Sequence, residues 1–294
     1  MKVRLLTSLG IAVFGLPLLF LSEYIVYPIA VGVLALMSTF ELLRAMGLEK
    51  RYMLAFPAYA IALAAPILAY PTVLGSDQTK FILILALALF GYLFYAVTVC
   101  VGSWALVREE GQSPKVGFSE MARCFFALVY ITVSFTSLCL IRYTGGEIDG
   151  IGVYYFEMIF IGAWVCDSCA YFTGRLLGRH KLAPVLSPKK TVEGSVGGMA
   201  FTVAAFALYG FIIEYFFGLD ANYAVLLITG FLLSVFSQVG DLIASLIKRE
   251  YGVKDYGRVL PGHGGILDRF DSILAVSSVL MVICLLFDPF TYVI

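Results

Sequence analysis

The chain has 294 residues, of which 61% are hydrophobic and only 14% are charged. Soluble globular proteins carry about 45–50% apolar and about 25% charged residues, so this composition excludes a cytosolic globular domain, a disordered chain and a nucleic-acid-binding protein. Twenty basic residues balance twenty acidic ones, so the net charge favours no partner, nucleic acid included. The composition therefore predicts an integral membrane protein.

Apolar stretches follow one another along the whole chain. A helix needs about 20 largely apolar residues to cross a bilayer. Nine stretches meet this need, near 5–21, 25–43, 53–71, 81–101, 123–141, 153–174, 196–217, 222–246 and 267–287. We therefore expect an all-α, polytopic membrane protein with about nine transmembrane helices. The first stretch resembles a signal peptide, but no small-residue cleavage site follows it, and we expect it to be retained.

Basic residues are distributed unevenly between the two sides that these spans define. All Lys and Arg residues except Lys80 and Arg142 fall on one side, which also holds the largest polar insertions, 102–122, 175–195 and 247–268. Basic loops stay in the cytoplasm. The N-terminus is therefore predicted to be cytoplasmic and the C-terminus outside, with the inner (cytoplasmic) membrane of a bacterial cell as the expected location.

We divide the chain into two functional parts. Residues 1–122 hold the first four predicted helices and a cytoplasmic loop, and residues 123–294 hold five helices that carry the candidate catalytic site. Small residues such as Gly197 and Gly198 allow helices to pack closely. Such packing can occur within one chain or between two copies, so a homodimer is one expectation.

Carboxylates within the spans are the first candidates for function. An ionisable residue in a span is costly and usually faces the protein interior or a water-filled cavity. Asp268 and Asp271 are three residues apart and share a helix face. Each acid alone is also explained as a solvated helix end, but four of them gather toward the cytoplasmic side. The four are Asp167, Asp241, Asp268 and Asp271.

Glycines and cations dominate the segment that follows the eighth span. Glycines let a backbone approach a ligand closely, and consecutive N–H groups and helix N-termini bind phosphate. Carboxylates beside bound phosphates need a cation, and Mg²⁺ is typically bound by one or two carboxylates plus substrate phosphates. The segment 248–265 therefore predicts a metal-dependent polyphosphate site at the cytoplasmic face. Binding of anionic head groups would explain its lysines but not its glycines or the nearby carboxylates.

A second basic segment, 175–195, contains Ser187, Lys189, Lys190 and Thr191. Lysines are point charges suited to phosphate, and hydroxyl groups can add hydrogen bonds. The preference for cytoplasmic positive charge explains these lysines equally well. His263 is a candidate to contact phosphate or to act as acid or base, and a hydrogen bond that stabilises its loop is an equal alternative.

Three motifs occur together in the C-terminal half. The first is a signature-like segment, Ser245-x-x-Lys248-Arg249, Lys254-Asp255-x-Gly257 and Leu260-Pro261-Gly262-His263-Gly264-Gly265-x-x-Asp268-Arg269-x-Asp271. The other two are Trp164-x-x-Asp167-Ser168-x-Ala170-Tyr171 and Ser187-Pro188-Lys189-Lys190-Thr191-x-Glu193-Gly194. Together they resemble the motifs of a known enzyme family, the phosphatidate cytidylyltransferases, also called CDP-diacylglycerol synthases. The resemblance covers roughly the C-terminal half, whereas the N-terminal half is similar only in hydropathy and number of spans.

The resemblance implies that CTP and phosphatidic acid are converted to CDP-diacylglycerol and pyrophosphate, with the lipid phosphate attacking the CTP α-phosphorus in line. It implies Mg²⁺, with room for a second metal ion, and CTP as the nucleotide. The implied catalytic residues are Asp241, Asp268, Asp271 and Lys248, with Asp167 completing the metal ligands. The implied substrate-binding residues are Ser187, Lys189, Lys190, Thr191, Ser245, Lys254, Asp255, Arg258, Gly262, His263, Gly264, Gly265 and Arg269.

Other functions share some of these features. A polyprenol or lipid kinase would use the same metal and nucleotide chemistry but transfer the γ-phosphate. An ion-coupled secondary transporter also has carboxylates within its spans. Against a transporter, the acids lie toward one face, and no inverted repeat is visible. A structural membrane anchor would need neither the glycine-rich segment nor the four acids.

Overall fold

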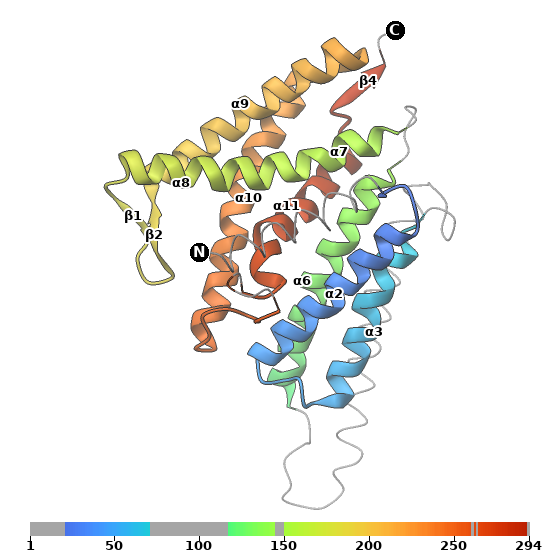
Figure 1. Ribbon diagram of the computed structural model, residues 1–294, viewed down its shortest axis with the longest axis vertical. Helices are drawn as coiled ribbons and strands as arrows, with labels where there is room; N and C mark the ends of the chain where they lie inside the picture. Colours follow the sequence, from blue (N-terminus) through green and yellow to red (C-terminus); the bar gives the residue numbers. More distant parts are fainter. Residues whose placement is uncertain (1–20, 71–116, 145–149, 260–261, 263, 293–294) are drawn as a thin grey trace, which may run out of the picture. The chain divides into compact units, whose positions relative to one another are not determined.

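The computed structural model describes residues 21–70, 117–144, 150–259, 262 and 264–292 (Figure 1). The predicted spans near 5–21 and 81–101, as well as His263, lie outside these residues. In the described part, six helices are long and apolar enough to cross a membrane, and α3 (Tyr52–Leu68) is a shorter apolar helix. An all-α membrane protein is therefore confirmed. The count of nine spans and the orientation of the termini stay predictions.

The described residues form two compact units. The first comprises residues up to 139 together with 255–267, and the second comprises 140–254 together with residues from 268 onward. The division at residue 122 into an N-terminal part and a catalytic part concerns function and stays a prediction.

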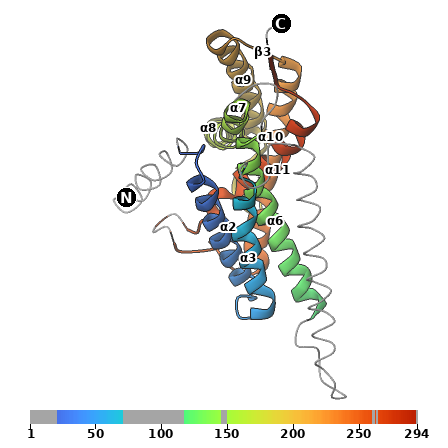
Figure 2. The same cartoon turned by 90° about the vertical axis from the view of Figure 1, so that its right-hand side faces the viewer.

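The described helices of the first unit are α2 (Val26–Ala45), α3 and most of α6 (Phe118–Arg142), and the segment 255–267 belongs to the same unit. Helices α2 and α3 lie side by side in both Figure 1 and Figure 2. Gly32 of α2 makes this possible, because a Cβ there would collide with the backbone oxygen of Leu63. Beyond the α2–α3 turn, Arg51 forms an ion pair of 2.8 Å with Glu120 of α6.

The second unit begins with a long helix that contains one wide turn. Helix α7 (Ile151–Phe160) continues through the π-helical segment η1 (Ile161–Val165) into α8 (Cys166–Leu177). Such π-helical turns are rare and frequently occur at functional sites. The wide turn ends directly before Cys166 and Asp167, so it helps to set the direction in which this acid points.

Helix α9 (Val192–Phe217) packs against both α8 and α10 (Tyr223–Glu250), and α11 (Leu267–Leu286) belongs to the same unit from residue 268 onward. The α8–α9 contact uses the small residues noted in the sequence. A Cβ on Gly197 would collide with Thr173, and one on Gly198 would meet Ala170 at 3.0 Å. Packing within one chain thus accounts for both glycines, and they give no support to a homodimer.

Four short strands are added to the predicted all-α fold. Strands β1 (Lys181–Ala183) and β2 (Ser187–Thr191) pair in antiparallel fashion between α8 and α9. Strands β3 (Leu219–Ala221) and β4 (Phe290–Tyr292) pair likewise and connect the C-terminal segment to the α9–α10 turn. The first pair matters for the candidate site, because it carries the lysines predicted to bind phosphate.

Candidate active site

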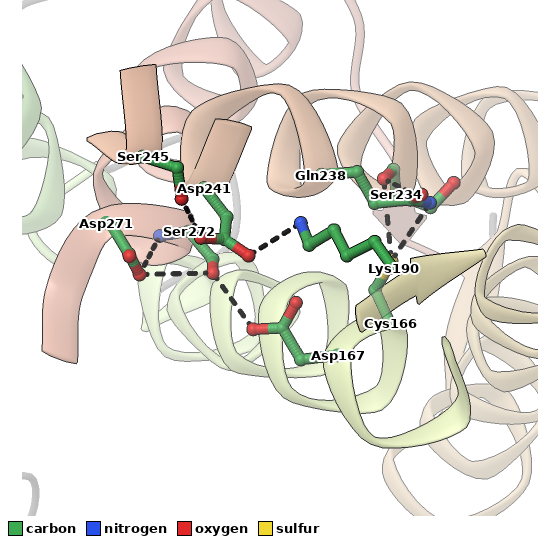
Figure 3. A network of polar contacts seen from close by, with 9 residues as sticks. All are labelled: Cys166, Asp167, Lys190, Ser234, Gln238, Asp241, Ser245, Asp271 and Ser272. Carbon is green, nitrogen blue, oxygen red and sulfur yellow. Dashed lines mark hydrogen bonds and ion pairs between the residues drawn. The ribbon is translucent and has the colours of Figure 1, made fainter. Parts of the chain in front are cut away.

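Three carboxylates from three different helices come together in the second unit (Figure 3). Asp167 lies in the first turn of α8, and Asp271 lies in the first turns of α11. Asp241 lies in the half of α10 that is predicted to be cytoplasmic. Each of the three interacts electrostatically with the other two. Like charges repel at such positions, so the site requires cations or hydrogen-bond donors to compensate them.

A glycine allows two of these helices to approach. A Cβ on Gly240 would meet the Cβ of Ala275 at 2.6 Å and the backbone oxygen of Asp271 at 3.0 Å. Only a residue without a side chain fits this contact between α10 and α11. Because Gly240 directly precedes Asp241, the close approach brings the Asp241 and Asp271 backbones near each other.

Lys190 is one cation at this cluster. Its Nζ lies 2.6 Å from Oδ2 of Asp241, and the two side chains are 24% and 29% exposed. Lys190 lies on β2, so the strand pair places this lysine directly beside the Asp241 carboxylate of α10 (Figure 3). Ser245, one helical turn after Asp241, contacts the other carboxylate oxygen at 3.5 Å.

Ser272 connects the other two carboxylates. Its hydroxyl donates a hydrogen bond of 2.9 Å to Oδ2 of Asp167, and its backbone N–H donates one of 2.9 Å to Oδ1 of Asp271. Ser272 was not among the residues predicted for the site. Its position directly after Asp271 was the signal that the sequence offered, but only the tertiary structure, which places Ser272 of α11 beside Asp167 of α8, reveals what the hydroxyl binds.

The fourth predicted acid forms a separate ion pair. Nζ of Lys248 lies 2.9 Å from Oδ1 of Asp268, and the side chains are only 13% and 4% exposed. Lys248 also attracts Asp271 electrostatically. Among the residues that the structure describes, the carboxylates of Asp167, Asp241 and Asp271 therefore outnumber the lysines beside them, Lys190 and Lys248, which gives the cluster an excess of acidic groups.

This excess suits a divalent cation. Carboxylate oxygens are the ligands that Mg²⁺ prefers. Within the ranges that the structure describes, no three His, Cys, Asp or Glu side chains are grouped so that they could hold a metal ion as they stand. The acids are instead bound by Lys190, Lys248 and Ser272. The donor atoms and the charge fit the ion, whereas the ligand set itself stays a prediction.

Thr191 has a local structural role. Its Oγ1 accepts a hydrogen bond of 3.1 Å from the N–H of Gly194, which caps the N-terminus of α9, and Thr191 is only 8% exposed. Ser187 and Lys189 lie on the same strand, and Lys189 is exposed. The strand thus presents one lysine to the carboxylates and one to solvent.

The remaining predicted residues lie in or beside the glycine-rich segment. Lys254 and Arg269 are exposed parts of the second unit, and Asp255 and Arg258 are exposed parts of the first. Gly262 and Gly264 have φ values of 77° and 87°, in the left-handed region that favours glycine. Glycine therefore suits the backbone conformation at these two positions.

A further acid, which the sequence analysis missed, binds the end of this segment in the first unit. Glu41 of α2 accepts hydrogen bonds of 3.1 Å from the N–H of Ile266 and 2.9 Å from the N–H of Leu267, where α11 begins. A carboxylate of the protein thus occupies these two N–H groups. The phosphate site expected at the N-terminus of this helix stays a prediction.

Comparisons with known proteins cover nearly the whole chain. The model of a family described as the cytidylyltransferase family matches residues 2–287. The chain is 34% identical over 283 residues to a phosphatidate cytidylyltransferase of Staphylococcus haemolyticus, which covers 96% of this chain and 98% of the relative. Proteins of the same name from Staphylococcus epidermidis and Staphylococcus aureus are 35% and 33% identical with the same coverage.

Proposed function

The chain belongs to the cytidylyltransferase family and is therefore a nucleotidyltransferase, and from this premise we propose that it converts CTP and phosphatidic acid into CDP-diacylglycerol and pyrophosphate. The assignment of these two substrates rests on one observation: over 96% of its length, the chain is similar to relatives named phosphatidate cytidylyltransferase. The geometry of the second unit supports the chemistry, because it gathers carboxylates and lysines among apolar helices.

In the proposed reaction a phosphate oxygen of the lipid attacks the α-phosphorus of CTP, and the bond to the β-phosphate breaks. A phosphate monoester is already ionised near pH 7, since its second pKa is about 6, so the site needs no dedicated general base. The protein must mainly position two anionic substrates and neutralise their charge. We assign the phosphates of both substrates to Lys189, Lys190, Lys248, Lys254, Arg258 and Arg269, with Ser187 and Ser245 as hydrogen-bond donors.

We further assign Mg²⁺ to the carboxylates, with Asp167, Asp241 and Asp271 to hold it and Asp268 as a fourth candidate that would permit a second ion. When bound, the ion would act as a Lewis acid that withdraws charge from the phosphates. The oxygen donors and the excess of acidic groups in the cluster support this assignment.

The expected result with the purified protein in lipid nanodiscs is CDP-diacylglycerol, identified by mass spectrometry, when phosphatidic acid, CTP and Mg²⁺ are all present. Replacing Mg²⁺ by excess EDTA should abolish product, and adding Mg²⁺ back should restore it. ATP in place of CTP serves as the control nucleotide. A phosphorylated lipid made from ATP would instead indicate a lipid kinase, and intact CTP with a folded sample would contradict the proposed activity.

The two adjacent lysines of β2 offer a matched pair of variants. Lys190→Ala should lower turnover by a factor on the order of 100, because it removes the cation that compensates the Asp241 carboxylate. Lys189→Ala should mainly raise the KM for one substrate, because Lys189 is exposed and can act only on a bound phosphate. Steady-state kinetics with each substrate varied in turn distinguishes the two. Equal effects of both variants would contradict the assignment.

The protein is an integral membrane protein, and relatives from bacteria support the cytoplasmic membrane as its location. We propose that the active site faces the cytoplasm, because CTP is soluble there and because the basic loops lie on the side that the distribution of positive charge assigns to it.

A further inference from the structure

Glu41 is a buried acid that lies far in sequence from the motifs that suggested the function. It lies on α2, in the N-terminal half of the chain, and only 1% of its surface is exposed. Burying a carboxylate is costly unless its charge is met by hydrogen bonds or a partner charge. The N–H groups of Ile266 and Leu267 supply two such bonds, at 3.1 and 2.9 Å.

Besides satisfying the buried carboxylate, these hydrogen bonds place its negative charge at the N-terminus of a helix. The first N–H groups of a helix lack partners within the helix, and its N-terminus carries a partial positive charge. The Glu41 carboxylate therefore fixes the point at which the glycine-rich segment ends and α11 begins. Asp268, one of the predicted catalytic acids, is the next residue in the chain.

Two glycines of the signature-like segment are packed against the same carboxylate. A Cβ on Gly257 or on Gly265 would collide with the oxygens of Glu41. Neither glycine has a positive φ, unlike Gly262 and Gly264. Thus Gly257 and Gly265 leave room for the Glu41 carboxylate, where a side chain would collide with it. Gly262 and Gly264 instead allow a left-handed backbone conformation.

Helix α2 also holds the beginning of the segment. Nη2 of Arg44, three residues after Glu41, donates a hydrogen bond of 2.9 Å to the backbone oxygen of Tyr256. Tyr256 itself is only 3% exposed. The segment between these two attachments, 257–265, contains the exposed Arg258.

We infer that Glu41 is a positioning residue: it holds Gly257 and residues 265–267, at the two ends of the glycine-rich segment, in place for binding of the triphosphate. A loop that is already ordered does not have to be ordered by its ligand, so its affinity is higher. The inference rests on the proposed function, since it takes the triphosphate as the ligand. It assigns the N-terminal half of the chain a role in the reaction that its sequence did not suggest.

Glu41→Gln tests the inference with little change in shape. The amide keeps one acceptor oxygen but loses the charge, and its NH₂ group faces a backbone donor. We expect kcat/KM for CTP to fall by about ten-fold or more, mainly through KM, while the KM for phosphatidic acid stays within about two-fold. Hydrogen exchange of the amides in 256–267 should become faster, whereas that of 226–238 in α10 should not change.

Ser38→Ala is the matched control. Ser38 lies on the same helix, three residues before Glu41, and is fully buried. In the described part of the chain its hydroxyl has no hydrogen-bond partner, so its removal should change neither kinetics nor exchange. Wild-type KM values and wild-type exchange in Glu41→Gln would overturn the inference.

One glycine variant, made in two backgrounds, tests the same contact when Glu41→Gln does not fold. Gly265→Ala alone should impair CTP binding, because its methyl group displaces the carboxylate. In the Glu41→Ala background the same substitution should have a much smaller effect, because the space is then free. Additive effects would overturn the inference. A wild-type protein that makes no CDP-diacylglycerol would refute the proposed function instead, and the exchange measurement would still test the contact.

Discussion

Asp271→Asn is expected to lower turnover by a factor on the order of 100–1000, because it removes one of three converging charges without changing the shape of the side chain. The backbone N–H of Ser272 can still donate to the amide oxygen, so the local fold should persist. CDP-diacylglycerol formation measured at saturating substrate and Mg²⁺ checks the prediction. Asp268→Asn should have a similar effect if this acid also serves the reaction.

Asp220→Asn is the control for these variants. Asp220 is an exposed acid on β3, paired in register with Thr291 and separate from the candidate site. It should retain full activity. Near-normal turnover in both Asp271→Asn and Asp268→Asn would contradict a site built on these carboxylates, and a resemblance in sequence would then not extend to the mechanism.

Lys248→Met is expected to destabilise the protein by about 3–5 kcal/mol, because it breaks a buried ion pair by removing the cation that compensates the Asp268 carboxylate. The two side chains are 13% and 4% exposed, so solvent cannot replace the lost interaction. Thermal unfolding in detergent should reveal the loss. A thiol-reactive dye can follow it, since Cys124, Cys139, Cys166 and Cys284 are buried in the folded protein.

The double variant Lys248→Met/Asp268→Leu separates stability from function. Replacing both partners by apolar residues removes the uncompensated charge, so thermal stability should recover toward the wild-type value. Turnover should stay low, because both residues are assigned to the reaction. A single variant Lys248→Met that is as stable as the wild type would show that the ion pair contributes nothing to the fold.

The sequence by itself determined the class of fold and the family. Every predicted span that falls in the described residues corresponds to an apolar helix, because a run of about 20 apolar residues is stable across a bilayer only as a helix. The resemblance to phosphatidate cytidylyltransferases is likewise confirmed by the near-full-length matches. Both conclusions depend on local patterns, which can be read without knowing what packs against what.

The partners of the charged side chains were decided only by the tertiary structure. From their spacing, Asp268 and Asp271 formed one pair on a helix face, but Asp268 binds Lys248 and Asp271 binds the Ser272 backbone. Lys190 was assigned to phosphate, and in this structure it binds Asp241.

Ser272 and Glu41 show the same limit most clearly. Neither belongs to a recognisable motif, and each acquires its role from a different helix or segment, Ser272 from Asp167 of α8 and Glu41 from the start of α11. Such contacts depend on close approaches like the one at Gly240, where the absence of a side chain lets two helices meet. Helix formation is a local property of the chain, whereas the neighbours of a buried charge depend on how the helices pack.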